Sequence, residues 1–303
     1  MTSLKLTIII CTYNRAFILG ECLNSLCAQI SPAEYFRVLV IDNNSTDNTH
    51  DLVELFSEKL PGLQYVFEPK QGLSHARNRG LAEAQTEWVA FLDDDAKASP
   101  GWIQSILDTI GAGDFDCFGG PYVAWHHFGP KPAWVEEDFG TYLGSGKYGA
   151  LGDFHIPGGN CAFKKSVAIT SGSFPDEFGM KGKQCAYGEE TFLFSMMQKK
   201  GVGMGFVPDM MIEHCVLPYK YKLRWRLYVA YAGGRDYYRV YQCSVVRAFD
   251  MLGKACLWYL PQKFTWCCRQ KLPLQRIFLE CWRPILSAFG ALYSSIRLSF
   301  LRR

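Results

Sequence analysis

The chain has 303 residues, of which 49% are hydrophobic, so it can bury a large core and is neither disordered nor fibrous. Its formal net charge is only +3, but the charge is unevenly distributed. Residues 1–215 hold 16 Lys and Arg against 26 Asp and Glu, whereas residues 216–303 hold 16 against 3. A basic tail on an acidic body indicates a polyanionic partner for the tail, either a membrane surface or a nucleic acid. The twelve cysteines form no CxxC pair and no leader-like segment opens the chain, so we expect reduced thiols in the cytoplasm.

Strand and helix patterns alternate through the first third of the chain. Apolar runs without polar alternation predict strands buried on both faces of a parallel sheet, at residues 6–11, 37–41, 63–67 and 88–92. Helical spacing of apolar residues predicts the connecting helices, at residues 18–27, 47–59 and 75–84. The alternation predicts a Rossmann-like α/β half.

Polar side chains follow these strands, at the edge where open α/β sheets bind ligands. The first strand leads into Thr12-Tyr13-Asn14-Arg15, the second into Asp42, and the fourth into Asp93-Asp94-Asp95. Three consecutive acids repel one another unless a cation lies among them. Asp93 and Asp95 point to the same side of an extended segment, so they can hold Mg²⁺ or Mn²⁺. The alternative is a solvated acidic turn.

The chain contains no glycine-rich phosphate loop, neither GxGxxG after the first strand nor GxxxxGK[ST]. This disfavours dinucleotide cofactors and P-loop chemistry. A phosphate group would then be bound by the metal and by Arg15, Arg77 or Arg79. The alternative for these arginines is ordinary surface charge.

The second half contains an aromatic, glycine-rich stretch and a charged helix. Residues 119–159 suit stacking on sugar rings, or an irregular hydrophobic lid. Glu189 and Glu190 open a helix whose last turn carries Lys199 and Lys200, a pattern that also suits the helix dipole alone. The functional interpretation is that the helix N-terminus keeps one carboxylate ionised, ready to accept a proton from a hydroxyl group.

Five motifs in order and spacing resemble the family-2 glycosyltransferases, which have the GT-A fold. The motifs are TIIICTYNR, VLVIDNNSTDNT, GLSHARNRGLAEAQTEWVAFLDDDA, PGGNCAFKK and YGEETFLFSMMQKKG. The resemblance covers roughly residues 5–235. It implies a mixed α/β sheet flanked by helices, with a nucleotide-binding half over residues 1–118 and an acceptor-binding half over residues 119–235. A basic, amphipathic helical tail over residues 236–303 completes the predicted domain organisation.

The resemblance also implies roles for individual residues. The donor nucleotide and its diphosphate are expected at Thr12, Tyr13, Arg15, Asp42, Arg77, Asn78, Asp93 and Asp94. The metal is expected at Asp93, Asp95 and His214, the last after a strand-like run over residues 206–213. The catalytic base is expected at Glu190, the second acid of its pair, with Glu189 as a substitute. The acceptor is expected at Gly158, Gly159 and Asn160.

The implied activity is inverting transfer of a sugar from a nucleotide-diphosphate donor, expected to be a UDP-sugar, with Mn²⁺ or Mg²⁺ as cofactor. The acceptor would be a hydroxyl of a saccharide or lipid-linked saccharide, in cell-surface polysaccharide or glycolipid synthesis. One alternative is a sugar-1-phosphate nucleotidyltransferase. Those enzymes open with a glycine-rich loop, which the TYNR segment of this chain does not resemble. The other is an inactive membrane-associated adaptor, against which the acids at 93, 95 and 190 argue.

The tail mixes Lys and Arg with tryptophans, in helical stretches predicted to break at Pro261, Pro273 and Pro284. Its longest apolar run, residues 285–296, is too short to span a bilayer. We therefore expect helices lying on an anionic membrane surface, with the protein peripheral at the inner face of the membrane. The alternative is a helical cap on the body. Nucleic acid is not an expected partner, because bulky aliphatic residues interrupt the basic ones.

Overall fold

The computed structural model describes residues 4–182, 185–241 and 244–301 and divides into two compact units. The first, called the catalytic unit, comprises Met1–Trp125, Gly140–Glu177 and Glu189–Cys215. The second, called the helical unit, comprises His126–Phe139, Phe178–Gly188 and Val216–Arg303. The boundary predicted at residue 235 lies inside a helix, and the helical unit takes in two earlier loops that no local pattern assigns to it.

The catalytic unit is built on an eight-stranded mixed sheet with the order β3-β2-β1-β4-β9-β6-β10-β8. Its strands are β1 (Leu6–Thr12), β2 (Phe36–Asp42), β3 (Leu63–Phe67), β4 (Trp88–Leu92), β6 (Cys117–Gly119), β8 (Gly149–Ala150), β9 (Asn160–Lys164) and β10 (Met204–Phe206). The first four are parallel to one another, whereas β9 runs antiparallel between β4 and β6. A second sheet consists of β5 (Ala96–Ala98), β11 (Ile212–Cys215) and β7 (Tyr122–Trp125).

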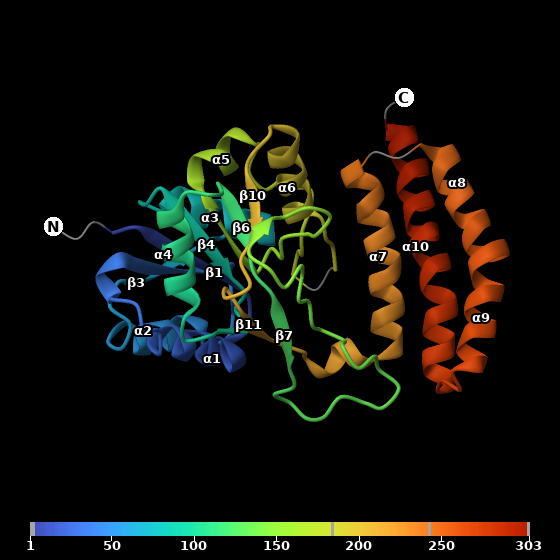
Figure 1. Ribbon diagram of the computed structural model, residues 1–303, viewed down its shortest axis with the longest axis horizontal. Coiled ribbons are helices and arrows are strands. Elements are labelled where there is room, and N and C mark those ends of the chain that lie inside the picture. Colours follow the sequence, from blue (N-terminus) through green and yellow to red (C-terminus); the bar gives the residue numbers. More distant parts are fainter. Residues whose placement is uncertain (1–3, 183–184, 242–243, 302–303) are drawn as a thin grey trace. The chain divides into compact units, whose positions relative to one another are not determined.

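Helices cover both faces of the large sheet (Figure 1). One face packs against α1 (Ala16–Cys27), α2 (Thr49–Ser57) and α4 (Trp102–Ala112). The other packs against α3 (Leu73–Glu83), α5 (Lys165–Thr170) and α6 (Glu189–Lys199). Successive strand residues point to opposite faces, so Ile8 and Ile10 of β1 enter the first core and Ile9 the second. This double burial explains why the strands are continuous apolar runs, and the predicted mixed α/β fold is confirmed.

One predicted element was wrong. The strand-like run over residues 206–213 is split, because β10 ends at Phe206 and β11 begins at Ile212 in the other sheet. Pro208 lies between them, where Met210 N–H donates to the Val207 carbonyl in a turn. A proline has no N–H for a ladder hydrogen bond, and it ends a strand for that reason.

The helical unit contains α7 and a chain of helices along the tail. They are α7 (Leu223–Tyr241), α8 (Val245–Lys254), the π-helical turn η3 (Ala255–Tyr259), α9 (Leu260–Arg269) and α10 (Leu274–Leu301). The 3₁₀ turn η2 (Pro218–Tyr221) precedes α7, and a second 3₁₀ turn, η1 (Ala33–Tyr35), lies in the catalytic unit. Within this unit α10 packs against α7, α8 and α9 (Figure 1). Glycines permit the closest approach, because a Cβ added at Gly234 would lie 1.8 Å from the Ser287 carbonyl oxygen.

The predicted proline breaks are only partly correct. Pro273 separates α9 from α10, but Pro261 lies in the first turn of α9 and Pro284 lies inside α10. Pro261 follows the π-helical turn η3 without a gap, so it lies within one continuous helical stretch formed by α8, η3 and α9. Among the helices described, none combines the length and apolar character needed to cross a bilayer.

Candidate active site

The carboxyl ends of β1, β2 and β4 bring the predicted polar residues to one edge of the sheet. Thr12 is opposite Asp42 in the parallel register, and Asp93 follows β4 directly. The loops after β1 and β2 are joined, because Asn14 N–H donates to the Ser45 hydroxyl oxygen at 2.9 Å. Residues from separate parts of the chain therefore share this edge.

Asp42 is held by groups that sequence reasoning missed. The Tyr65 hydroxyl donates to one carboxylate oxygen at 2.7 Å, and Ser45 N–H donates to the other at 2.8 Å. Burial and this hydrogen bond raise the pKa of Tyr65. The neighbouring Asn43 accepts from Gly72 N–H at 2.7 Å, which fixes the loop before α3. Alternation in β3 could have shown Tyr65 to be half-buried, but not which acid it contacts.

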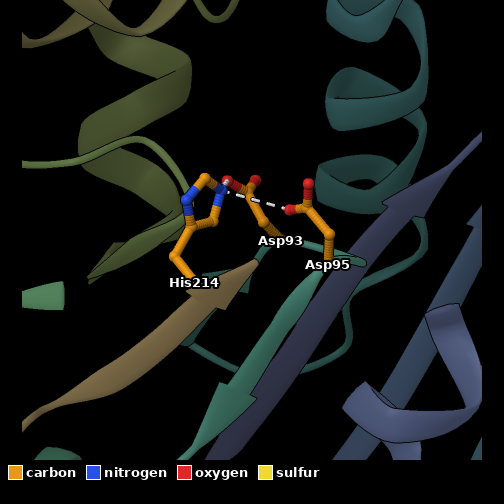
Figure 2. A group of neighbouring side chains, drawn as sticks. All are labelled: Asp93, Asp95 and His214. Carbon is orange, nitrogen blue, oxygen red and sulfur yellow. Dashed lines mark ion pairs between the residues drawn. The ribbon is translucent and has the colours of Figure 1, made fainter. Parts of the chain in front are cut away.

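Asp93, Asp95 and His214 form a compact cluster in which the three side chains point toward one another (Figure 2). The Nε2 atom of His214 lies 3.1 Å from Asp95 Oδ1 and 3.7 Å from Asp93 Oδ2. Cys215 N–H donates to the Asp95 carbonyl at 2.8 Å, which holds β11 against the acidic turn. One ligand atom from each of the three residues lies within 4.8 Å of the others. Two carboxylates and an imidazole suit a divalent metal ion.

The third acid of the run, Asp94, is paired with Arg15. The Nη1 atom of Arg15 lies 2.7 Å from Asp94 Oδ1 and 3.1 Å from Asp95 Oδ2. Burial raises the pKa of Asp94 to about 6, against the opposing effect of Arg15. Tyr13, which follows Thr12 in the same loop, is half-buried. Arg15 therefore lies on the acids of the cluster, and its predicted contact with phosphate stays a prediction.

Arg77 joins α3 to the start of α6. Its guanidinium Nη1 lies 3.2 Å from Glu189 Oε1 and 3.5 Å from Glu190 Oε2. The side chain is 6% exposed, and its guanidinium carbon is 5.2 Å from the ring centre of Phe174 and 5.8 Å from that of Phe91. Arg77 thus contacts both glutamates, and its expected contact with the nucleotide stays a prediction.

The pKa values of the two glutamates are shifted in opposite directions. Burial and the neighbouring Glu190 charge raise the pKa of Glu189 well above its usual value. Burial acts in the same direction on Glu190, but the Arg77 guanidinium and a hydrogen bond from Glu189 outweigh it, so the pKa of Glu190 is lowered. The Glu190 side chain is 27% exposed and that of Glu189 only 4%. The more accessible acid is therefore the one whose pKa is lowered, as suits a general base.

Gly158 and Gly159 lie directly between the acidic cluster and the glutamates. A Cβ at Gly159 would lie 2.0 Å from the carboxylate carbon of Asp93, and a Cβ at Gly158 would lie 2.9 Å from Glu190 Cγ and 3.1 Å from Arg77 Nη2. Asp93 N–H also donates to the Gly159 carbonyl at 3.2 Å. Only glycine leaves room for both carboxylates here, and the predicted acceptor contact of the pair stays a prediction.

Two other predicted site residues use their side chains inside the fold. Asn160 is fully buried, accepts from Trp102 Nε1 at 2.8 Å, and donates to the Met210 carbonyl at 2.8 Å. Asn78 donates to the Phe174 carbonyl at 2.7 Å and accepts from Phe174 N–H at 3.0 Å. Both side chains fasten loops that border the site.

Comparisons with known proteins identify the family of the chain. The family described as Glycosyl transferase family 2 matches residues 7–171, more than half of the chain. Succinoglycan biosynthesis protein ExoM of Rhizobium meliloti (strain 1021) is 29% identical over 243 residues, which is 78% of this chain and 75% of that protein.

Two solved structures share the fold. The mannosyltransferase PcManGT from Pyrobaculum calidifontis, in complex with GDP-Man and Mn²⁺, has a TM-score of 0.56 at 18% identity, over 99% of this chain and 79% of that one. TarS 1-349 from S. aureus, in complex with UDP-GlcNAc, has a TM-score of 0.57 at 17% identity, over 98% of this chain and 92% of that one. The chain belongs to glycosyl transferase family 2, and the protein is a glycosyltransferase with the GT-A fold.

Proposed function

We propose that the protein transfers a sugar from a nucleotide-diphosphate donor, a UDP-sugar, to a hydroxyl of a saccharide or lipid-linked saccharide, with inversion at the anomeric carbon. The observation that carries the proposal is the juxtaposition, through Gly158 and Gly159, of a cluster that suits a metal ion and a carboxylate whose pKa is lowered. Similarity to a protein named for succinoglycan biosynthesis supports a role in cell-surface polysaccharide or glycolipid synthesis.

The residues divide the chemistry between them. Mn²⁺ or Mg²⁺ bound by Asp93, Asp95 and His214 would neutralise negative charge on the departing diphosphate. Glu190 would accept the proton of the acceptor hydroxyl as its oxygen attacks the anomeric carbon. Arg77 favours the ionised form of Glu190, and burial favours the protonated form of Glu189. One base and a single in-line displacement give inversion, and no covalent enzyme intermediate is needed.

Turnover of a panel of nucleotide sugars with Mn²⁺ tests this proposal. We expect metal-dependent release of a nucleoside diphosphate from one donor. The release should be slow when water is the acceptor and faster once a hydroxyl acceptor is supplied. A sugar-1-phosphate nucleotidyltransferase would instead release pyrophosphate from a nucleoside triphosphate. Turnover of no donor, together with pyrophosphate release, would replace the proposal with that alternative.

We further propose that the protein is peripheral at the inner face of the cytoplasmic membrane. Large apolar side chains are exposed along η3 and α9, including Leu257 at 83% and Trp258 at 65%. Lys254 and Lys263 are exposed on the same stretch. Exposed Trp and Leu among cations suit an interface with anionic lipid, which the cytoplasmic leaflet carries.

A further inference from the structure

The second half of α7 carries an acid that is almost completely buried. Asp236 is 1% exposed, and its carboxylate accepts hydrogen bonds from Arg235 Nε at 2.8 Å and from Arg235 Nη2 at 2.7 Å. Arg239 Nη1 lies 3.7 Å from Asp236 Oδ1. A buried carboxylate is costly unless it is paired and hydrogen-bonded. The two arginines offset that cost, but they do not explain why an acid is buried here.

The same ion pair holds the peptide that leads into the two glutamates. Tyr187 N–H donates to Asp236 Oδ2 at 2.9 Å. Arg235 Nη2 donates to the Cys185 carbonyl at 3.0 Å. Helix α6 begins two residues after Tyr187. The acid and its arginine therefore bind the backbone directly before the helix that opens with the catalytic pair.

The residue between this peptide and α6 is a glycine that lies very close to α7. Gly188 has a φ of +105°, which side chains rarely permit. A Cβ at this position would lie 2.9 Å from Val240 Cγ2 and 3.4 Å from Phe178 Cδ1. Phe178 also carries the Arg239 guanidinium 4.9 Å from its ring centre. Contacts with α7 therefore fix the backbone up to the residue before α6.

This part of α7 is itself immobilised by α10, which packs beside it (Figure 1). A Cβ at Gly290 of α10 would lie 2.1 Å from the Tyr231 carbonyl oxygen. The Ser294 hydroxyl donates to the Arg235 carbonyl at 2.9 Å. Close packing of this kind leaves little freedom to the turn that carries Asp236. The acid is therefore mounted on a rigid support, as a group that positions a site requires.

We propose that Asp236 is a positioning residue for the catalytic base. It fixes the Tyr187 peptide and, through the chain, the start of α6, where Glu190 lies. The inference rests on the proposed function, because that function makes Glu190 the base. A general base must reach the proton that it accepts, so a small displacement of the helix start slows the reaction. The donor nucleotide is expected at the carboxyl ends of the strands, so its affinity should not depend on Asp236.

Two variants of the full chain separate the hydrogen bond of Asp236 from its charge. Asp236→Ala removes the acceptor of the Tyr187 amide, whereas Asp236→Asn keeps an oxygen that can accept from it. In Asp236→Ala we expect kcat to fall about tenfold to 100-fold, with a nearly unchanged KM for the donor. Asp236→Asn should recover most of kcat. Asp250→Asn is the matched control, because Asp250 is an exposed acid of the same unit, paired with Lys254.

Hydrogen exchange detects the displaced peptide without any substrate. The amides of residues 185–191 should exchange faster in Asp236→Ala than in the wild-type protein, whereas those of α4 should keep their rates. Faster exchange in both segments would mean that the variant has lost its fold. An ester in place of the Tyr187 peptide N–H then decides, because it removes this hydrogen bond and leaves Asp236 with its arginines. The ester variant should show the same loss of kcat.

A wild-type kcat in folded Asp236→Ala or in the ester variant would overturn the inference. Unchanged exchange of residues 185–191 would also overturn it, and so would a loss that appears in the donor KM and not in kcat. Failure of the proposed function is a different result, namely a wild-type protein that turns over no nucleotide sugar. An enzyme that turns over its donor equally well without Asp236 would lose only this inference.

Discussion

The two units of the protein each concentrate charge, but with opposite signs. In the catalytic unit, three consecutive acids meet Arg15 and His214. In the helical unit, one acid meets three arginines. Glu136 lies 2.5 Å from Arg226 Nη2, 3.0 Å from Arg276 Nη1 and 2.8 Å from Arg283 Nη2.

The difference separates a site that recruits a ligand from one that closes on itself. Buried acids in excess repel one another, and a divalent cation relieves that repulsion. The three arginines around Glu136 are instead met by contacts within the helical unit. The Arg226 guanidinium lies 4.3 Å from the Phe139 ring centre, and Arg276 also pairs with Glu280 at 2.9 Å. The first arrangement indicates function, and the second fastens the loop His126–Phe139 to α7 and α10.

The largest effect is expected from Asp95→Ala, which removes a carboxylate of the metal cluster. Nucleotide-diphosphate binding measured by calorimetry should require Mn²⁺ and should weaken by about 100-fold or more in the variant. Asp51→Ala is the control, because Asp51 is an exposed acid of the same unit. Tight nucleotide binding without metal, or unchanged binding in Asp95→Ala, would contradict the assignment of the acidic cluster as a metal site.

Glu190→Gln should come next, lowering kcat by about 100-fold to 10,000-fold with nearly unchanged donor affinity, as expected for a base used only in the transition state. Glu189→Gln should cost much less. The raised pKa of Glu189 favours its protonated form, and a neutral amide resembles that form in shape and charge.

Steady-state kinetics on both variants decide between the two roles. Reversed effects would make Glu189 the base. Full activity in both would leave the pair as helix N-terminal charges alone.

Glu136→Gln should lower the free energy of unfolding by about 3 kcal/mol, because three arginines would then face a neutral amide. This variant tests the basic cluster of the comparison. Glu137→Gln, at the exposed neighbouring position, is the control. Hydrogen exchange should speed up in His126–Phe139 and in the facing turns of α7 and α10.

The contacts between Glu136 and its arginines also predict how the stability of the protein depends on pH. Burial would raise the pKa of Glu136, but hydrogen bonds from its own backbone, Arg283 and Arg226 prevail and lower it. A lowered folded-state pKa contributes stability above the usual carboxyl range, and that stability is lost as the pH falls through the lowered value. Unfolding of Glu136→Gln should therefore lack this acid-dependent loss. An unchanged profile would mean that the arginines do not depend on the charge of Glu136.

The smallest effect is expected on the tail. Liposome flotation should show binding that rises with anionic lipid, falls with salt, and weakens roughly tenfold when Trp258 and Trp266 are both changed to Ala. Phe17→Ala, an exposed aromatic on the catalytic unit, should have no effect. A full-length protein that ignores anionic liposomes would make the helical unit a structural cap.

The sequence predicted what depends on neighbours along the chain and missed what depends on distant partners. Strand runs, the acidic turn after β4 and the paired glutamates of α6 are local patterns, and the first two lie at strand ends whose meeting place the parallel fold dictates. No local pattern predicted that Arg77 contacts Glu189. Nor did one predict the contact of Glu136 with Arg283, which lies 147 positions further along the chain. Asn160 was assigned from a motif, which records that a residue recurs but not which way its side chain points.

One hydrogen bond of the helical unit bears on how the protein can be shortened. Tyr187 N–H donates to Asp236 Oδ2 at 2.9 Å, and Asp236 is almost completely buried. Helix α6 begins at Glu189, two residues after Tyr187. A polypeptide cut after residue 235 would lack Asp236 and with it this hydrogen bond to the peptide that leads into Glu189 and Glu190. A shortened protein that keeps this hydrogen bond would therefore have to include residue 236 and could not end with the family motifs.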